Sequence, residues 1–546
     1  MFFVRLFLSC LVMLVGFFTL PQIAIAERMG QRVVTYLDSQ AHTSLYPPAA
    51  GFYPNGMIIA QITDRLTWQD PKTLDIKPWI AEHWDVSKDK KRYVFYLRSD
   101  VTFSDGSRLD ASAVARNYDI FGKGSKELHL PPAEVFSHYD HSEVLTSYSV
   151  AFYFSQPSPG FLQATSVLGA SLVSVSTLSH HFEEFGTGEN IIGSGPFIVK
   201  KDIPGKEIIL SKRPDYTWGP PSLGPVAPAQ VPGIHVIVIP EDSIRIGALL
   251  SGQADFIRDI APQDEAEILR QHYRMYAPST GGVSNSIAFH PENKFVSDER
   301  VRHSLMLGTN RAEIVSQLFS ESYPLARSIL VHSAKGFQDF SDRLLFDPIK
   351  ANALLEEAGW KKDINGWRQK NGERLTLTMH EAPQHPQSHE MLVLLGAQWR
   401  KLGVELRVIS GSPGTIILDN LNPKRTAMAD VEVGRADLDV LAEELMSLHR
   451  NVLLQTGGQS RYAKTYADEI LNAQLAELVS TKDDKIRQDA ARAIQAYILE
   501  HALMIPIFEE PQVYAATPDL EGVLFEAVGR PYFYKAYFMH QAHGGL

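Results

Sequence analysis

Residues 57–121 read MIIAQITDRLTWQDPKTLDIKPWIAEHWDVSKDKKRYVFYLRSDVTFSDGSRLDASAVARNYDIF, and they contain several turn, strand and helix signals in close succession. Asp70-Pro71-Lys72-Thr73 predicts a turn, because proline presets φ while Asp and Thr offer oxygens to nearby backbone N–H groups. A second turn at 87–91 precedes the aromatic and β-branched run 93–97, which predicts a β-hairpin. Asp110 is a typical helix N-cap before a run with apolar residues at helical spacing. The stretch therefore predicts a strand meander leading into a helix, with no cluster typical of catalysis.

Five segments of this stretch form an ordered pattern: Leu66 with Asp70–Thr73, then Pro78–Trp84, Phe95–Arg98, Val101–Gly106 and Ala111–Val114. The pattern resembles the signature region of bacterial extracellular solute-binding proteins of family five, the peptide, nickel and opine class that serves ABC importers. In that family the segments read Leu-x-x-x-Asp-Pro-x-Thr, Pro-x-Leu-Ala-x-x-Trp, an aromatic strand ending in Leu-Arg, Val-x-Phe-x-Asp-Gly and Ala-x-x-Val.

The resemblance implies an α/β fold, namely a two-lobed periplasmic binding protein of type II (Venus-flytrap) with an extra domain inserted in the first lobe. Gly281-Gly282 is expected to form a hinge into the second lobe. The expected segments are a signal peptide at 1–26, the first lobe at 27–52, 191–281 and 501–546, the extra domain at 53–190, and the second lobe at 282–500.

Local signals in the expected second lobe agree with an α/β organisation. Asp347-Pro348 predicts the start of a helix and Gly359 its end. Asn371-Gly372 predicts the turn of a hairpin that follows. Alternating helices and strands in one region are typical of an α/β lobe.

The first 26 residues predict export. They contain one charge, Arg5, then an apolar run from Leu6 to Leu20, and they close with Ala24-Ile25-Ala26. This is the pattern of a cleaved secretory signal peptide, and the apolar run is short for a membrane span. The single cysteine, Cys10, lies in this segment, so the mature chain is expected to have no disulfide and no cysteine nucleophile. We expect a periplasmic protein that is not embedded in the membrane.

Composition narrows the range of partners. The chain of 546 residues has 44% hydrophobic and 21% charged residues, an ordinary globular balance. Its formal net charge of −11, with no long basic run, argues against nucleic acid as a partner. We expect a monomer that needs no cofactor.

Relatives that bind peptides hold the ligand's ammonium group with an Asp of the second lobe. The corresponding stretch here is Glu432-Val433-Gly434-Arg435-Ala436-Asp437-Leu438-Asp439, in which the family's Trp and Pro are absent. Asp437 and Asp439 are candidates for the ammonium-binding carboxylate, and Arg435 could hold a ligand carboxylate. The alternative is a solvated cluster of surface charges.

Two further candidates are polar or aromatic loop residues. His380, His385 and His389 lie close together in sequence and could bind a metal, but two prolines and the spacing favour a polar loop at the rim of the cleft. We therefore predict no metal site and keep His380 and His385 as candidate ligand contacts. Tyr46 stands where the family has Asp, and either faces the cleft or is a packed loop aromatic.

The resemblance implies the substrate-binding component of an ABC importer, which encloses an oligopeptide or similar small solute between two lobes and delivers it to a membrane permease. The alternative is a metal-chelate (nickel-type) or haem-binding component of such an importer. A periplasmic hydrolase is a further alternative, but no nucleophile, metalloprotease or cofactor-loop motif supports an enzyme.

Overall fold

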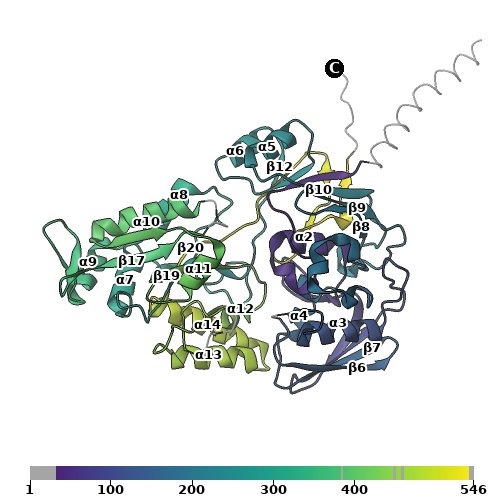
Figure 1. Cartoon of the computed structure of the whole chain (residues 1–546), viewed down its shortest axis with the longest axis horizontal. Helices are drawn as coiled ribbons and strands as arrows, with labels where there is room; N and C mark the ends of the chain where they lie inside the picture. Colours follow the sequence, from purple (N-terminus) through teal and green to yellow (C-terminus); the bar gives the residue numbers. More distant parts are fainter. Residues whose placement is uncertain are drawn as a thin grey trace, which may run out of the picture.

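The computed structural model describes residues 32–133, 135–382, 385, 387–446, 450–456 and 460–539. The expected signal peptide, with Cys10 and its cleavage site, lies outside these residues. The described chain forms two lobes that lie side by side, joined by segments that cross between them (Figure 1). Within the described ranges, no helix is both long and apolar enough to span a bilayer.

A seven-stranded sheet lies at the centre of the first lobe. β1 is parallel to both of its neighbours, with Tyr36 opposite Val236 on one side and Phe256 on the other. The first lobe is therefore assembled from segments that are far apart in sequence. In spatial order the strands are β12 (Arg274–Tyr276), β21 (Tyr514–Ala516), β11 (Phe256–Arg258), β1 (Val34–Asp38), β10 (Gly233–Val238), β9 (Glu207–Lys212) and β8 (Phe197–Ile203).

The predicted meander forms a separate antiparallel sheet of the first lobe. Its strands are, in spatial order, β4 (Ala81–Val86), β5 (Arg92–Leu97), β7 (Ser149–Phe154) and β6 (Tyr139–Thr146). The predicted helix follows as α3 (Ala111–Lys123), and the Asp110 side chain accepts a hydrogen bond from the backbone N–H of Ala113 at 2.9 Å. The predicted hairpin and N-cap are thus confirmed.

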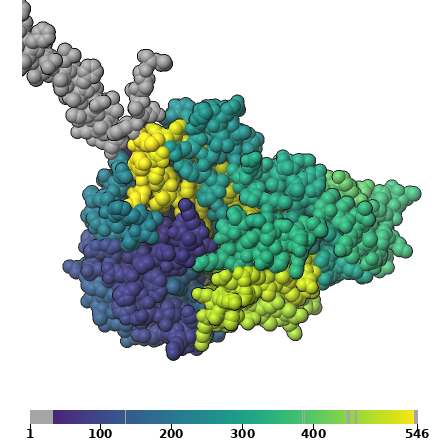
Figure 2. Space-filling model, turned by 180° about the vertical axis from the view of Figure 1, so that it is seen from behind, coloured from purple at the N-terminus to yellow at the C-terminus, as the bar shows by residue number. Residues whose placement is uncertain are grey.

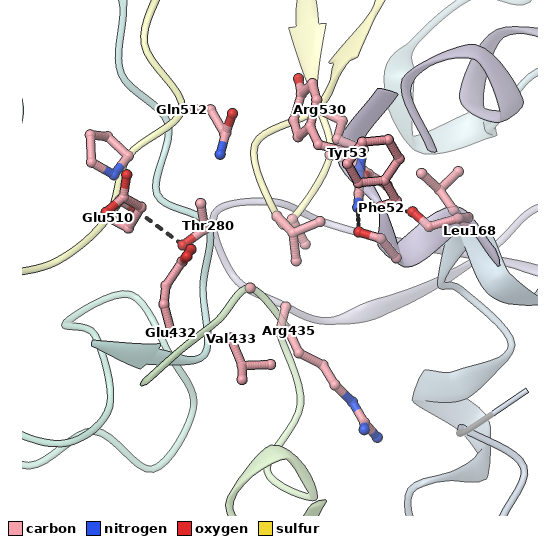
Figure 3. A pocket seen from close by; sticks show the side chains of 18 of the residues that line it. Phe52, Tyr53, Leu168, Thr280, Glu432, Val433, Arg435, Glu510, Gln512 and Arg530 are labelled. Carbon is pink, nitrogen blue, oxygen red and sulfur yellow. Dashed lines mark hydrogen bonds and ion pairs between the residues drawn. The ribbon is translucent and has the colours of Figure 1, made fainter. Parts of the chain in front are cut away.

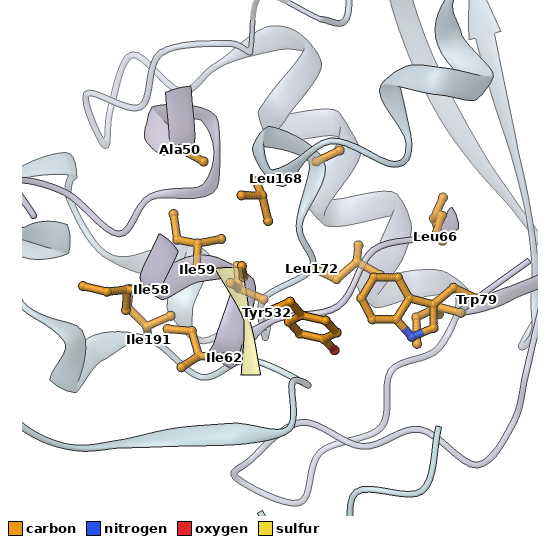
Figure 4. Close-up of a cluster of buried hydrophobic side chains, with 14 of the residues drawn as sticks. Ala50, Ile58, Ile59, Ile62, Leu66, Trp79, Leu168, Leu172, Ile191 and Tyr532 are labelled. Atoms are coloured by element: carbon orange, nitrogen blue, oxygen red, sulfur yellow. The ribbon is translucent and has the colours of Figure 1, made fainter. Parts of the chain in front are cut away.

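The core of the first lobe surrounds α2 (Tyr53–Ile62), a helix that is buried along nearly its whole length. Figure 4 shows Ile58, Ile59 and Ile62 of this helix packed among apolar side chains from other segments. Tyr532, close to the C-terminus, lies in the same cluster, and Gln61 donates a hydrogen bond to the carbonyl of Pro531 at 2.8 Å. The end of the chain therefore completes the first lobe.

The second lobe has its own hydrophobic core and a central three-stranded antiparallel sheet, β19 (Met428–Val433), β13 (Val283–Phe289) and β20 (Met504–Phe508). A parallel pair, β17 (Thr376–His380) and β18 (Glu405–Ile409), lies in the same lobe. The main helices are α7 (Glu299–Leu307), α8 (Arg311–Leu318), α9 (Pro348–Glu357), α10 (Ser388–Leu402), α13 (Glu469–Ser480) and α14 (Asp484–Glu500).

Local predictions in this lobe agree with the structure. Asp347 caps α9 by accepting a hydrogen bond from the backbone N–H of Lys350, and Gly359 follows with a φ of 86°. Asn371 and Gly372 both have positive φ and join β15 (Arg368–Lys370) to β16 (Glu373–Arg374). The helix and the hairpin turn are therefore confirmed.

One expected boundary differs from the structure. The last segment of the first lobe was expected to begin at 501, but β20 belongs to the second lobe, because Ile505 pairs with Ile287 of β13. The chain leaves the second lobe only after Phe508. The physical reason is that the apolar run 504–508 is buried between β13 and the second-lobe helices, so it cannot leave its sheet earlier.

Candidate functional site

A cavity of about 1830 Å³ lies between the two lobes. The first lobe contributes Phe52, Tyr53 and Leu168 to its wall, and the second lobe contributes Val433 and Arg435 (Figure 3). Phe508 and residues 510–513 of the crossing segment also line it. Its wall combines apolar side chains with many polar and charged ones. A large concave site between domains is a usual place for a small-molecule ligand.

The lobes touch one another beside this cavity. Gln69 of the first lobe donates a hydrogen bond to the carbonyl of Ala436 at 3.2 Å, and Lys335 of the second lobe lies 3.7 Å from the carboxylate of Asp75. Seen from behind, atoms of the two lobes abut (Figure 2). The described form is therefore one in which the lobes are in contact.

Gly281 and Gly282 lie where the chain enters the second lobe, next to the cavity residue Thr280. Both have positive φ, 69° and 73°, and a Cβ at Gly282 would lie 2.0 Å from the carbonyl oxygen of Val433. Only glycine fits this close approach of two backbones. The pair thus fixes how the crossing segment meets the end of β19.

Three arginines on the first-lobe side of the cavity have carboxylate partners, whereas a fourth, Arg245, donates hydrogen bonds to backbone carbonyls. Arg258 bonds Asp38 at 2.9 Å, and its guanidinium lies 4.1 Å from the centre of the Tyr53 ring. Arg65 and Arg530 share Glu526, at 3.2 and 3.1 Å. These groups therefore shape the wall, and the charge of Glu526 is divided between two arginines.

The end of β19 places Arg435 in the cavity wall. Its Nε donates a hydrogen bond to Oδ2 of Asp437 at 2.5 Å, while its Nη1 is buried and has no hydrogen-bond partner among the described residues. Figure 3 shows the Arg435 side chain directed away from Glu432 and Glu510. The guanidinium is held at one side and retains an unused donor, as a group that binds a carboxylate requires.

An acidic group lines the opposite part of the same cavity. His385 lies 3.3 Å from Glu432 and 3.6 Å from Asp430, and Glu510 follows β20 nearby. The backbone carbonyl of Glu510 accepts a hydrogen bond from Oγ1 of Thr280 at 3.1 Å (Figure 3). Two carboxylates therefore pair with one imidazole, and the Glu510 carboxyl group lines the same part of the cavity.

Burial and mutual repulsion shift the pKa values of this group. Burial raises the pKa of Asp430 to about 6, although the His385 charge opposes the rise. Burial, then the charge of Glu432, raises the pKa of Glu510 well above its usual value. For His385, burial would lower the pKa, but the hydrogen bond to Glu432 and the charge of Asp430 outweigh it and raise the pKa to about 10. His385 is therefore an imidazolium near neutral pH.

Of the six predicted contact residues, Arg435 and His385 line the cavity, and the other four do not. Asp437 holds Arg435 from outside the lining. Tyr46 is fully buried against Phe121, Phe182 and Phe185, and its hydroxyl donates to the carbonyl of Pro131 at 3.1 Å. This placement matches the packed-aromatic alternative left open above.

His380 is also buried, at the end of β17, where its Nε2 lies 3.0 Å from Oδ2 of Asp419. Asp439 forms an ion pair with Arg487 of α14 and faces the first lobe. A Cβ at Gly160, just before α4 (Phe161–Ala164), would lie 2.0 Å from Oδ2 of Asp439. Asp439 therefore lies at the contact between the lobes.

The sequence did not single out Glu510, Asp430, Glu432 and Asn285, all of which line the cavity. For Glu510, the sequence contains a signal that could have identified it as a site residue. Glu509-Glu510-Pro511 directly follows a fully buried apolar strand, and charged residues at the point where such a strand ends deserve to be tested as site residues.

The three clustered histidines do not converge on one point. Besides the pairs of His380 and His385, His389 lies 3.0 Å from Glu381. In the described part of the chain, the one group with donor atoms close enough for a metal ion is His129, His181 and Glu183, which is exposed on the first lobe. Pro383, Gln384 and Pro386 of the histidine loop lie outside the described residues.

A sequence model of bacterial extracellular solute-binding proteins, family 5 Middle, matches residues 75–436. The dipeptide-binding protein of Escherichia coli (strain K12) is 23% identical over 359 residues, which are 62% of this chain and 64%, just under two thirds, of that protein. The nickel-binding periplasmic protein of the same strain is 24% identical over 472 residues, covering 83% of this chain and 84% of that protein.

Solved structures share the fold. NikA from Brucella suis, in complex with Fe(III)-EDTA, matches with a TM-score of 0.76 at 21% identity, over 92% of this chain and 100% of that chain. This similarity confirms the predicted α/β, two-lobed architecture of a type II periplasmic binding protein.

Proposed function

Because the chain belongs to family 5 of the bacterial extracellular solute-binding proteins, we propose that it is the periplasmic substrate-binding component of an ABC importer. It captures an oligopeptide or similar small solute between its lobes and delivers it to a membrane permease. The observation that carries this proposal is the cavity of about 1830 Å³, lined by both lobes and by the segments that cross between them. A solute in that position selects the closed form, because only that form contacts it from both sides.

Arg435 and His385 are the proposed contacts among the residues chosen from sequence, because both line the cavity. Arg435 offers its unpaired Nη1 to a carboxylate of the solute. Asp437 acts through Arg435, and Asp439 acts at the contact between the lobes. Tyr46 and His380 support the structure around the cavity.

As a binding protein of this family, the chain is divided into two lobes and an extra domain of the first lobe. Residues 53–190 form an extra domain of the first lobe, built on the four-stranded meander and α3. Residues 282–508 form the second lobe, and the chain after Phe508 returns to the first. The two crossings, at 277–283 and 508–513, act as the hinge.

We place the mature protein in the periplasm as a monomer, after cleavage between Ala26 and Glu27. The intact mass of protein isolated from the periplasm tests this directly. A chain that begins at Glu27 supports it, and a chain that retains Met1 in the membrane fraction contradicts it.

Mass spectrometry of the solute that co-purifies with protein from its native periplasm tests the function. A bound peptide or other small organic solute, released on denaturation and rebound by the refolded protein, supports the proposal. A protein that retains no solute, and that turns over peptides at a steady rate, would instead support a hydrolase.

A metal-chelate carrier is the second candidate, because one relative is a nickel-binding periplasmic protein at 24% identity. Metal analysis of the same preparation distinguishes a metal-chelate carrier from a carrier of an organic solute. Stoichiometric nickel or haem iron would favour this candidate, and an organic solute without metal would favour the first.

A further inference from the structure

Two loops of the first lobe bring two imidazoles and a carboxylate together at the surface. His129 lies in the turn 125–130, while His181 and Glu183 lie at the start of the short helix η4 (Phe182–Gly186). One donor atom from each side chain lies within 4.8 Å of the other two, and all three residues are exposed. None of the three lines the cavity between the lobes. The group is therefore separate from the proposed solute site.

Backbone hydrogen bonds hold the two loops together beside these side chains. The backbone groups of Ser125 and Leu130 exchange two hydrogen bonds, at 2.8 and 2.9 Å, which close the turn around His129. The backbone N–H of Phe182 donates to the carbonyl of Leu128 at 2.9 Å. This bond joins the residues adjacent to the two histidines, so the histidines lie next to each other.

The short helix η4 is anchored to the core of the first lobe. The rings of Phe182 and Phe185 pack edge-on against Tyr46, with ring centres 6.0 and 5.2 Å away. The side chain of Glu184 accepts a hydrogen bond from the backbone N–H of His181 at 2.8 Å, which fixes the start of the helix. The backbone of the group is thus held in place by the fold, and an ion that binds there needs to order only three side chains.

The three side chains are already close to the geometry of a metal site. Nδ1 of His129 lies 3.2 Å from Oε1 of Glu183, and the ring centres of His129 and His181 lie 5.8 Å apart at an angle of 65°. A tetrahedral ion with bonds of about 2.0–2.1 Å separates two of its ligand atoms by about 3.3–3.4 Å. Because the side chains are exposed, rotation about their own bonds is enough to direct all three at one ion.

The donor set indicates which kind of ion fits. Two imidazoles and one carboxylate are ligands of zinc and related transition metals, and a site with three protein ligands leaves a fourth position for water. Magnesium and calcium prefer oxygen ligands throughout, so they fit less well.

We propose that His129, His181 and Glu183 bind a divalent transition-metal ion of the zinc type on the surface of the first lobe, with one coordination position open to water. This site goes beyond the proposed function, because it binds the ion whether or not a solute occupies the cavity. It is also distinct from the metal-chelate alternative, in which the metal would lie between the lobes.

The test uses untagged protein isolated from the periplasm, because a polyhistidine tag would itself bind zinc. The protein is stripped with EDTA, dialysed and titrated with zinc chloride, and in parallel with magnesium chloride, in competition with a chromogenic chelator. We expect the wild type to bind one equivalent of zinc and no magnesium. His129→Asn and His181→Asn should each weaken zinc binding about 100-fold or more, since the loss of a residue that only supports a ligand already costs about 10- to 100-fold. Asparagine tolerates the φ of 55° at position 129, so His129→Asn adds no backbone strain.

His141→Asn on β6 is the matched control. His141 is also an exposed histidine beside a carboxylate, 2.9 Å from Asp140, but it does not belong to the three-residue group, so its replacement should leave zinc binding unchanged. A second readout separates ion binding from a structural role. Zinc should raise the melting temperature of the wild type and of His141→Asn but not of His129→Asn, because an ion that binds the folded state stabilises it. Without zinc, all variants should melt as the wild type does, since the replaced side chains are exposed.

The surface site is overturned if the wild type binds less than one equivalent of zinc, if His129→Asn binds zinc as tightly as the wild type, or if His141→Asn loses as much affinity. A metal that is bound only together with a solute, and that persists in His129→Asn, would also overturn it and would favour a metal-chelate carrier. Retention of the co-purifying solute, measured in parallel, should be equal in all variants with and without zinc. A wild type that retains no solute would contradict the proposed function and leave the zinc result standing.

Discussion

Asp437 holds Arg435 in place: Oδ2 of the carboxylate accepts a hydrogen bond from Nε of the guanidinium at 2.5 Å. The sequence presents the two as separate candidates for opposite ends of a solute. In the structure they form one unit, of which only Arg435 reaches the cavity wall. Asp437 is therefore proposed as a positioning residue, whose effect on binding depends on Arg435.

Arg435→Gln should weaken binding of the co-purifying solute by tenfold or more, since a lost hydrogen bond to a charged group is worth about 1.5–3 kcal/mol. Asp437→Asn should have a smaller effect, and this effect should vanish when Arg435 is already replaced. Titration calorimetry on the single and double variants measures both, with exposed Arg407→Gln as control. A large effect of Asp437→Asn that persists in the double variant would mean that Asp437 contacts the solute itself.

Gly160→Leu should oppose the contact between the lobes, because even a Cβ at this position would lie 2.0 Å from Oδ2 of Asp439. The φ of Gly160 is −77°, so the substitution adds bulk without backbone strain. We expect a larger radius of gyration in solution scattering and a weaker apparent affinity, because less of the protein is in the closed form.

Gly247→Leu on α5 (Asp242–Leu250) is the control for the Gly160→Leu substitution, because a Cβ at Gly247 meets nothing within 4 Å. If Gly160→Leu and Gly247→Leu scatter alike and bind solute equally well, the contact between Gly160 and Asp439 does not govern closure.

The 380–389 histidines should not bind nickel stoichiometrically, because each pairs with a different carboxylate: His380 with Asp419, His385 with Glu432, and His389 with Glu381. Treatment with a chelator should leave the affinity for an organic solute unchanged, as measured by calorimetry with parallel metal analysis. One equivalent of nickel in the purified protein that is lost in His385→Gln would contradict this prediction and favour the metal-chelate carrier.

Asp64 should make the first lobe less stable as pH rises. Burial raises its pKa from 3.8 to about 7, even though Tyr216 and Trp218 both donate hydrogen bonds to the carboxylate at 2.9 Å. A pKa that is higher in the folded state means that the neutral form stabilises the fold below pH 4, and that this stabilisation is lost as pH rises to about 7. The loss corresponds to about 4 kcal/mol.

Asp64→Asn lacks this titration, so the free energy of unfolding of the wild type should fall relative to the variant between pH 4 and pH 7. Chemical denaturation at several pH values measures the difference, with exposed Asp140→Asn as control. Parallel pH profiles of the wild type and Asp64→Asn would contradict the buried, protonated state of Asp64.

Local sequence signals predicted the elements well where each depends on a few neighbouring residues. Asp110 and Asp347 cap their helices as expected, because a short side chain reaches a backbone N–H three residues away. Asn371-Gly372 forms the hairpin turn because both residues tolerate positive φ. The boundary at 501 failed because it depended on which sheet the run 504–508 joins, and that choice is made by the distant strand β13.

The candidate site could be predicted less well, and Tyr46 illustrates the reason. From sequence alone, the Tyr46 side chain could face the cleft or pack within its loop. In the structure it is buried, because it packs against the aromatic rings of Phe121, Phe182 and Phe185. Whether a polar residue faces a cavity depends on the path of segments that are remote in sequence.

The family, the α/β class, the turns and the helix caps could all be predicted from the sequence, because they depend on an ordered motif and on interactions between near neighbours. Only the tertiary structure brought Glu510 after β20 together with Asp430 and Glu432 of β19. A register shift between Asn285 and Ser286 also decides which β13 side chains face the cavity, since a slip of one residue reverses the face of a strand. Such pairings are set by how strands from distant parts of the chain meet, and this follows from packing of the whole lobe.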